Sequence, residues 1–170
     1  HRENRILHAV DGTISANATQ GSGADECEVE IIEPMPYALV TGGGESVFAD
    51  ALGNYTLPTT SGDPVTVTSQ IQGEWFNVNN QIANDSSLSM DVEPEGSGNF
   101  VHNFSNSDEF YRAEVNAYIE SNVVRDFVLN INPDFPTIGD QTNWPVNVNI
   151  NDSCNAYYDY SSINFYRNTG

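Results

Sequence analysis

The sequence of 170 residues contains no lysine, and its basic side chains are five arginines, at positions 2, 5, 112, 125 and 167. The chain carries 24 acidic residues, which leave a formal net charge of −19. Nucleic acids and anionic membrane surfaces bind clustered positive charge, so we expect neither as a partner. No apolar run is long enough to span a bilayer, so we expect no membrane insertion. Acidic residues in this number are typical of a solvated surface.

Histidine is nearly as scarce as lysine. The three histidines are His1, His8 and His102, and the sequence contains no His-Glu-x-x-His. Zinc hydrolysis needs three protein ligands and a general base, usually with two of the ligands on one helix. We therefore expect no catalytic residue, no metal site and no other cofactor in this chain, and we interpret His102 as a structural or exposed histidine of a strand.

Cysteine occurs twice, as Cys27 and Cys154. A disulfide between them would close a long loop and stabilise the fold by roughly 4–5 kcal/mol in the chain-entropy description. The residues alone do not decide whether this pair forms.

Asparagine is abundant and forms five Asn-x-Ser/Thr sequons, at Asn17, Asn54, Asn84, Asn103 and Asn151. Such sequons are acceptors for N-glycosylation in secreted proteins. Their number favours an extracellular, glycosylated protein.

The first half of the chain has the pattern of short β-strands. Residues 65–71 alternate so that Val65, Val67 and Ile71 share one face, and Gly, Pro and Asn clusters separate this strand from its neighbours. We expect Asp11-Gly12 to be a turn that divides a strand at residues 6–10 from one at residues 13–15. Strands at this spacing predict a β-sandwich.

The stretch Asp-Ala-Leu-Gly-Asn-Tyr-Thr-Leu at residues 50–57, followed by the alternating strand and Gly73, resembles the transthyretin-like or carboxypeptidase-regulatory-like module. This resemblance implies that the N-terminal part is a small Greek-key β-sandwich. Residues 81–98 are polar and contain Gly and Pro, so we place a domain boundary there. The expected division is residues 1–98 and residues 99–170.

A long helix is predicted from residue 107, with Ser107 as its N-cap, to about residue 130, before Pro133. Apolar residues recur at helical spacing: Phe110, Ala113, Ala117, Val124, Phe127 and Ile131. This stripe is widened by Tyr111, Val115, Tyr118 and Ile119. So wide a stripe predicts burial on two sides of the helix. Arg125 and Asp126 are expected to form a structural ion pair or to be solvated.

The C-terminal part has the pattern of a small antiparallel meander with asparagines on its open face. Val146, Val148 and Ile150 alternate with asparagines, and strands at residues 155–158 and 163–166 follow turns. The expected fold class is mainly β with one long helix (α+β).

The order Asn155-Ala156-Tyr157-Tyr158-Asp, then Ile-Asn-Phe-Tyr at residues 163–166, resembles the edge-strand region of thermolysin-like and fungalysin-like zinc metallopeptidases. The resemblance covers residues 107–170. It implies that the Asn155 side chain hydrogen-bonds the backbone of an extended peptide, that the Ala156 carbonyl accepts from it, and that Tyr157 and Tyr158 line the subsite. The alternative is an ordinary strand with a buried asparagine.

The same resemblance has two further implications. It gives Cys154 a partner cysteine beyond residue 170 instead of Cys27. It also makes zinc a cofactor only of a longer parent protein, because the zinc-binding helix would follow residue 170.

Three functional hypotheses remain. The first is an extracellular acidic protein that forms the non-catalytic N-terminal portion of a secreted zinc-metallopeptidase-like protein. The second is a structural glycoprotein subunit that self-assembles into an extracellular filament or surface layer. The third is a carbohydrate- or protein-binding module that uses Trp75, Trp144 and the tyrosines. For the first two, the partner is an extended peptide or a neighbouring subunit.

Overall fold

The structure is a computed structural model that describes residues 8–19, 29–60, 62–152 and 155–167. Within these ranges it contains twelve strands and one helix. In chain order these are β1 (His8–Ala18), β2 (Ile31–Pro34), β3 (Ala38–Gly42), β4 (Glu45–Phe48), β5 (Asn54–Thr59), β6 (Val65–Gly73), β7 (Phe76–Asn80), β8 (Ser87–Val92), β9 (Phe100–His102), α1 (Glu109–Ile131), β10 (Trp144–Ile150), β11 (Ala156–Tyr158) and β12 (Ile163–Tyr166). The expected class, mainly β with one long helix, is confirmed for this part of the chain.

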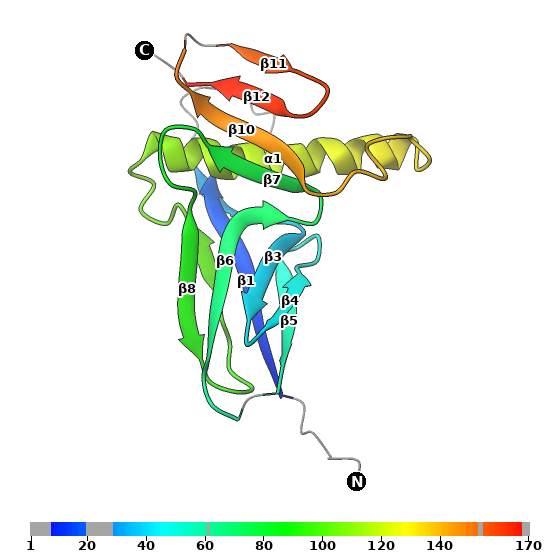
Figure 1. Cartoon of the computed structure of the whole chain (residues 1–170). Helices are drawn as coiled ribbons and strands as arrows, with labels where there is room; N and C mark the ends of the chain where they lie inside the picture. The colour runs from blue at the N-terminus through cyan, green and yellow to red at the C-terminus, as the bar shows by residue number, and fades with distance from the viewer. Residues whose placement is uncertain (1–7, 20–28, 61, 153–154, 168–170) are drawn as a thin grey trace.

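The strands form two sheets. The four-stranded sheet has the order β2-β1-β5, with β9 pairing in parallel with β1. The eight-stranded sheet has the order β11-β12-β10-β7-β6-β3-β4, with β8 pairing with β6. Figure 1 shows that β7, β10, β12 and β11 form the upper part of the molecule along α1, whereas the strands below run steeply to the helix.

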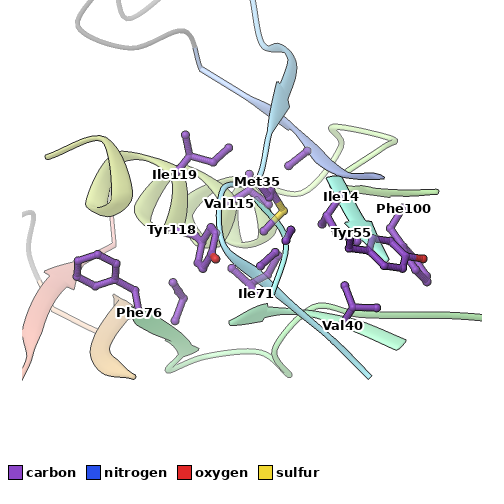
Figure 2. Packing of buried hydrophobic residues seen from close by; sticks show 14 of the residues in the cluster. Ile14, Met35, Val40, Tyr55, Ile71, Phe76, Phe100, Val115, Tyr118 and Ile119 are labelled. Carbon is purple, nitrogen blue, oxygen red and sulfur yellow. The ribbon is translucent and has the colours of Figure 1, made fainter. Parts of the chain in front are cut away.

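The core joins the two sheets to the helix. β6 buries alternate residues, including Val67 and Ile71, as its sequence pattern predicts. Figure 2 shows the buried side chains as one continuous cluster that extends from the four-stranded sheet to α1. Its members include Ile14, Tyr55, Phe100, Met35, Ile71, Val115, Tyr118 and Phe76. Burial of apolar area on this scale is the main favourable contribution to folding.

The turn expected at Asp11-Gly12 is wrong, because β1 runs unbroken from His8 to Ala18. The loop that contains Gly96 and Gly98 lies against β1 here: Asp11 N donates to Gly96 O (3.3 Å), and Gly98 N donates to Asp11 O (2.9 Å). A Cβ on residue 12 would overlap the carbonyl oxygen of Gly98. Glycine at this position therefore permits a close backbone approach and does not mark a turn.

The predicted helix is confirmed, with one correction at its start. The N-cap is Asp108, not Ser107, and the Asp108 carboxylate accepts from Phe110 N at 2.8 Å. Both residue types satisfy free N–H groups at a helix start, so local sequence does not separate two neighbouring candidates. The helix ends at Ile131, and Asn132 N donates to Val128 O.

The expected burial on two sides of α1 is also wrong. One side is buried against β7, β10, β1 and β6 and carries Val115 and Tyr118. On the other side, Val124, Phe127 and Ile131 are 55%, 63% and 71% exposed. The periodic pattern predicts an apolar surface, but nothing in the described residues covers this half of it.

Strands from both sides of the expected boundary at residues 81–98 share one sheet. β7 and β10 are parallel neighbours, with Val78 opposite Val146. β9, which follows the boundary, pairs with β1. In the described part of the chain, no helix has the length and apolar character needed to cross a membrane.

Candidate functional site

β11 is the terminal strand of the eight-stranded sheet, as expected of an open edge at residues 155–158. The expected antiparallel meander is wrong, because β12 pairs in parallel with β10 and lies between β10 and β11. It pairs antiparallel with β12, so that Ala156 lies opposite Phe165 and Tyr158 opposite Ile163. All three residues of β11 are exposed. The other long edge of this strand faces away from the sheet.

The hydrogen bonds of the β11–β12 pair show which backbone groups point outward. Tyr166 N donates to Asn155 O at 2.9 Å, and Asp159 N donates to Ser162 O at 3.4 Å. Because antiparallel pairs alternate between bonded and non-bonded positions, residues 155, 157 and 159 direct their backbone groups to β12. Ala156 and Tyr158 therefore direct theirs away from the sheet.

Asn155 already uses its side-chain oxygen. Asn155 Oδ1 accepts from Ala156 N at 2.8 Å, which occupies one of the outward donors. Within the described part of the chain, the Ala156 carbonyl and the Tyr158 N–H and C=O make no hydrogen bond. Asn155 is exposed, so the alternative of a buried asparagine is wrong.

A groove lies between α1 and the face of the sheet that β10, β12 and β11 turn toward the helix. Its main cavity has a volume of about 500 Å³. The walls include Trp75, Trp144, Val124, Tyr158, Ile163 and Phe165. A second depression of about 360 Å³ shares Ala117, Glu120 and Phe165 with the first. We call the two together the α1–sheet groove.

Arg125 closes one wall of this groove. Its guanidinium lies 3.5 Å from the centroid of the Trp75 ring, and Nη1 is 3.2 Å from Asp126 Oδ1. Of the two alternatives expected for Arg125 and Asp126, an ion pair or solvated side chains, the ion pair is the one observed. Asp126 Oδ2 also accepts from the hydroxyl of Tyr37 at 2.9 Å. Burial, and then this hydrogen bond, raise the pKa of Tyr37.

The face of the sheet turned away from α1 carries a row of asparagines. Asn79, Asn147 and Asn164 lie directly opposite one another on β7, β10 and β12. Asn79 Nδ2 donates to Asn147 Oδ1 (3.3 Å), and Asn147 Nδ2 donates to Asn164 Oδ1 (2.8 Å). The predicted asparagine face exists at Asn147 and Asn164, where the amides bond to one another. It is wrong for Asn149, which is 4% exposed and donates from Nδ2 to Phe110 O on α1.

A buried polar cluster was missed by sequence reasoning, apart from its histidine. Glu114 on α1 is fully buried; its carboxylate accepts from Asn80 Nδ2 (2.6 Å) and from Ser86 N (2.9 Å). Burial raises the pKa of Glu114 to about 7, against these two hydrogen bonds. A glutamate near an apolar helix stripe gives no sequence signal of burial.

His102 has the structural role expected of it. Its ring lies between two hydroxyls, 3.0 Å from Ser69 Oγ and 3.1 Å from Ser86 Oγ. Burial lowers the pKa of His102 to about 4, so the ring is neutral near pH 7. Ser69 lies on β6 and Ser86 lies between β7 and β8. The His102 ring is inaccessible to solvent.

The described residues contain no group of three His, Cys, Asp or Glu side chains placed to hold a metal ion. Cys27 and Cys154 lie outside the described residues, as does His1. The disulfide expectation therefore stays a prediction.

The five sequon asparagines differ in environment. Asn17 and Asn103 bind each other's segments: Asn17 Nδ2 donates to Phe104 O (2.9 Å), and Asn103 Nδ2 donates to Asn17 O (2.9 Å). Asn54 Nδ2 donates to the carboxylate of Asp50. Asn84 and Asn151 are exposed in the segments that follow β7 and β10.

Comparison with known proteins gives no relative: no protein-family model, no curated protein and no solved structure matches this chain. The candidate sites in the described part of the chain are therefore the edge of β11 and the α1–sheet groove.

Proposed function

We propose that this chain is a non-catalytic, extracellular polypeptide-binding portion of a secreted zinc-metallopeptidase-like protein, and that it holds an extended partner segment along β11. The observation that carries the proposal is the outward direction of the Ala156 and Tyr158 backbone groups on a terminal strand. An extended segment added to a sheet edge is held by main-chain hydrogen bonds and selected by its alternate side chains. The Greek-key, transthyretin-like character of the N-terminal sandwich belongs to the same proposal.

The available bonds set the strength of this binding. The Ala156 carbonyl and the Tyr158 N–H and C=O offer three bonds, each contributing about 1 kcal/mol net. Association costs at least about 4 kcal/mol in lost translational and rotational freedom. Backbone pairing alone therefore gives weak affinity, and side-chain contacts with Tyr158 and Phe165 must supply the rest.

The alternation of β11 determines where partner side chains lie. Ala156 and Tyr158 share the face that lines the α1–sheet groove, since Ile163 and Phe165 are their cross-strand partners. Partner residues opposite Ala156 and Tyr158 would lie on that face. The small Ala156 side chain leaves room beside Phe165 for one of them.

The test is an NMR titration of the ¹⁵N-labelled chain with a seven-residue peptide that alternates valine and arginine. Expected are shifts of the Ala156 and Tyr158 amide signals that saturate in the millimolar range. A peptide with alternate backbone nitrogens methylated is the control and should not shift them. Unchanged signals in β11 and β12 at saturating peptide would refute the proposal.

Ala156→Pro is the matched variant. The Ala156 N–H points away from β12 and is bonded to Asn155 Oδ1, so proline leaves the β11–β12 ladder intact. Its ring would instead project from the outward edge, where it blocks the approach of a partner strand. We expect unchanged folding, since the strand is an exposed edge, and at least fivefold weaker peptide binding. Equal binding by a folded Ala156→Pro chain would contradict edge pairing.

A second candidate function, assembly into a filament or surface layer, is favoured by the other end of the same sheet. There β4 is the terminal strand, and Phe48 on it is 49% exposed. Pairing of β11 in one copy with β4 in the next would continue the sheet from copy to copy. Light scattering at rising salt tests this candidate, because salt screens the repulsion between chains of charge −19. A monomer at every salt concentration would exclude it.

A further inference from the structure

The α1–sheet groove is wider than an edge strand requires. An α-helix is about 10 Å across and strands are about 4.8 Å apart, so one helix covers about two strands. α1 lies on β7 and β10, and the sheet continues beyond them through β12 to β11. α1 thus leaves uncovered an area about two strands wide, which is the width of one more helix, and the segment at residues 135–141 borders this area.

The surfaces that border this space are mainly apolar, and the segment after α1 adds Phe135 and Ile138 to them. The sheet contributes Ile163, Phe165 and Tyr158. The helix contributes Ala117 and Val124 to the groove, and Phe127 and Ile131 continue the same side of α1 toward its end. A helix–sheet layer is stable when each apolar face is covered by another element.

The charges around the groove are mainly negative. Glu109 and Glu120 line the second depression together with Arg167, and Asp134 and Asp140 lie exposed in the segment that follows α1. Arg125 is already paired with Asp126. All residues of the last turn of α1 are described, and none of them is basic. The negative end of the helix dipole is therefore not offset there.

We propose that the α1–sheet groove is the docking site for an amphipathic helix of a partner polypeptide, apolar on one face and rich in lysine or arginine on its flanks. The apolar face would lie on Val124, Ile163 and Phe165, and the basic flanks would face Glu120 and the acidic segment after α1. The groove shares the side chains of Tyr158 and Phe165 with the proposed edge site, but a helix in it would use none of the outward backbone groups of β11. This site therefore goes beyond the proposed function and does not rest on it.

Charge decides between this occupant and a second copy of the chain. Two copies would bring together equal net charges of −19 and the same acidic rim, which repel each other. A basic helix instead gains attraction from the rim. Its binding should weaken as salt rises.

Tryptophan fluorescence can report whether the groove is occupied. Its two tryptophans, Trp75 and Trp144, both line the groove. The probe is a synthetic 18-residue peptide with leucine on one helical face and lysine on the other. Two control peptides replace every lysine by glutamate or keep the composition in scrambled order. Added to the full chain, the lysine peptide should shift tryptophan emission to shorter wavelength and gain helical circular dichroism.

Neighbouring valines of α1 provide matched variants. Val124 lines the groove and is 55% exposed, whereas Val123 is 51% exposed and lies about 100° around the helix from it. We expect Val124→Asp to weaken binding of the lysine peptide at least tenfold. Val123→Asp adds the same charge to the same helix turn and should change binding less than twofold. Circular dichroism confirms that both variants fold.

Ala156→Pro separates this site from the edge. It should leave binding of the lysine peptide unchanged, so failure of the edge proposal and failure of this one give different results. The glutamate and scrambled peptides should bind at least tenfold more weakly.

Several results would overturn the proposal. One is unchanged tryptophan emission at saturating peptide, and another is equal weakening by Val123→Asp and Val124→Asp. Equal binding of the scrambled peptide would mean unspecific attraction to an acidic surface. If the peptide binds without gaining helix, and if Ala156→Pro abolishes that binding, the peptide binds at the edge of β11 and not in the groove. A dimer of the chain alone that Val124→Asp dissociates would assign the groove to a second copy.

Discussion

The guanidinium of Arg125 stacks on the indole ring of Trp75, 3.5 Å from the ring centroid, in a side chain that is 9% exposed. Cation–π contacts contribute about 2 kcal/mol when they are shielded from water. This contact fixes the segment between β6 and β7 against α1, and it forms one wall of the α1–sheet groove.

Replacing Arg125 by alanine should therefore lower the free energy of unfolding by about 2 kcal/mol. Arg125→Lys keeps the charge but loses the planar stack, so it should recover only part of the loss. Urea unfolding followed by circular dichroism measures both variants. Equal stability of wild type and Arg125→Ala would show that the stack contributes nothing.

Glu114 should make stability depend on pH. Burial raises the pKa of Glu114 to about 7 from its ordinary value of 4.5. The folded protein therefore holds this proton more tightly than the unfolded chain, and the stabilisation present below pH 4.5 is lost as pH rises through 7. Glu114→Gln cannot ionise, so its stability relative to wild type should rise across this window by about 3 kcal/mol at most.

The difference in the free energy of unfolding between wild type and Glu114→Gln reports on Glu114 alone. His102 also makes stability depend on pH, but in the opposite direction. Burial lowers the pKa of His102 to about 4, so its contribution is complete above pH 6.5 and is lost as pH falls toward 4. This contribution is common to wild type and Glu114→Gln and cancels. Glu93→Gln, at an exposed position in the loop after β8, is the control and should show no such rise. A pH-independent difference for Glu114→Gln would contradict the prediction.

The asparagine row should not tolerate loss of its donor. Asn147→Asp replaces the N–H group that bonds Asn164 Oδ1 with an oxygen, and Asn164 is 2% exposed. We expect a loss of about 2 kcal/mol in the free energy of unfolding near pH 7. The loss should shrink at low pH, where a protonated carboxyl can donate again.

Asn77→Asp is the matched control for this row. Asn77 lies on β7, two residues before Asn79, and its side chain makes no hydrogen bond within the described residues. The same change there should cost less than about 0.5 kcal/mol, as at an ordinary surface position. An equal loss at both positions would assign the effect to charge alone.

Glycosylation, if the chain is secreted through a glycosylating pathway, should be unequal among the sequons. Asn84 and Asn151 are exposed, whereas Asn17 and Asn103 use their Nδ2 atoms in hydrogen bonds that a glycan would disrupt. Mass spectrometry of the folded, secreted fraction should find sugar on Asn84 and Asn151 and none on Asn17 and Asn103. Asn84→Gln and Asn151→Gln should each remove one glycan. Sugar on Asn17 in folded protein would contradict the geometry.

Sequence reasoning succeeded where one strand or helix determines its own pattern. The alternation of Val65, Val67 and Ile71 predicts the buried face of β6, because the two faces of that strand meet different surroundings. Turn residues on both sides of β11 likewise locate a short strand.

It failed where a distant segment decides the outcome. Asp11-Gly12 has the local signature of a turn, but contact with the loop at Gly98 keeps it within β1. The stripe through Val124 and Phe127 predicts burial, but burial depends on an element that must lie against it. The groove was therefore not predicted as a site, although its helical wall was identified as apolar.

β6 joins the two parts of the eight-stranded sheet, and this connection determines how strongly each strand is protected from hydrogen exchange. β6 pairs with β8 along its first part and meets β7 only near its end, at Gln72 and Asn77. β10 depends on β7, β12 on β10, and β11 on β12, so each added strand is held by the one before it. Amides of β12 should thus exchange by local opening, with free energies well below that for amides of β1 and β6. A ligand on the far strands would slow their exchange first and leave the rates in β1 unchanged.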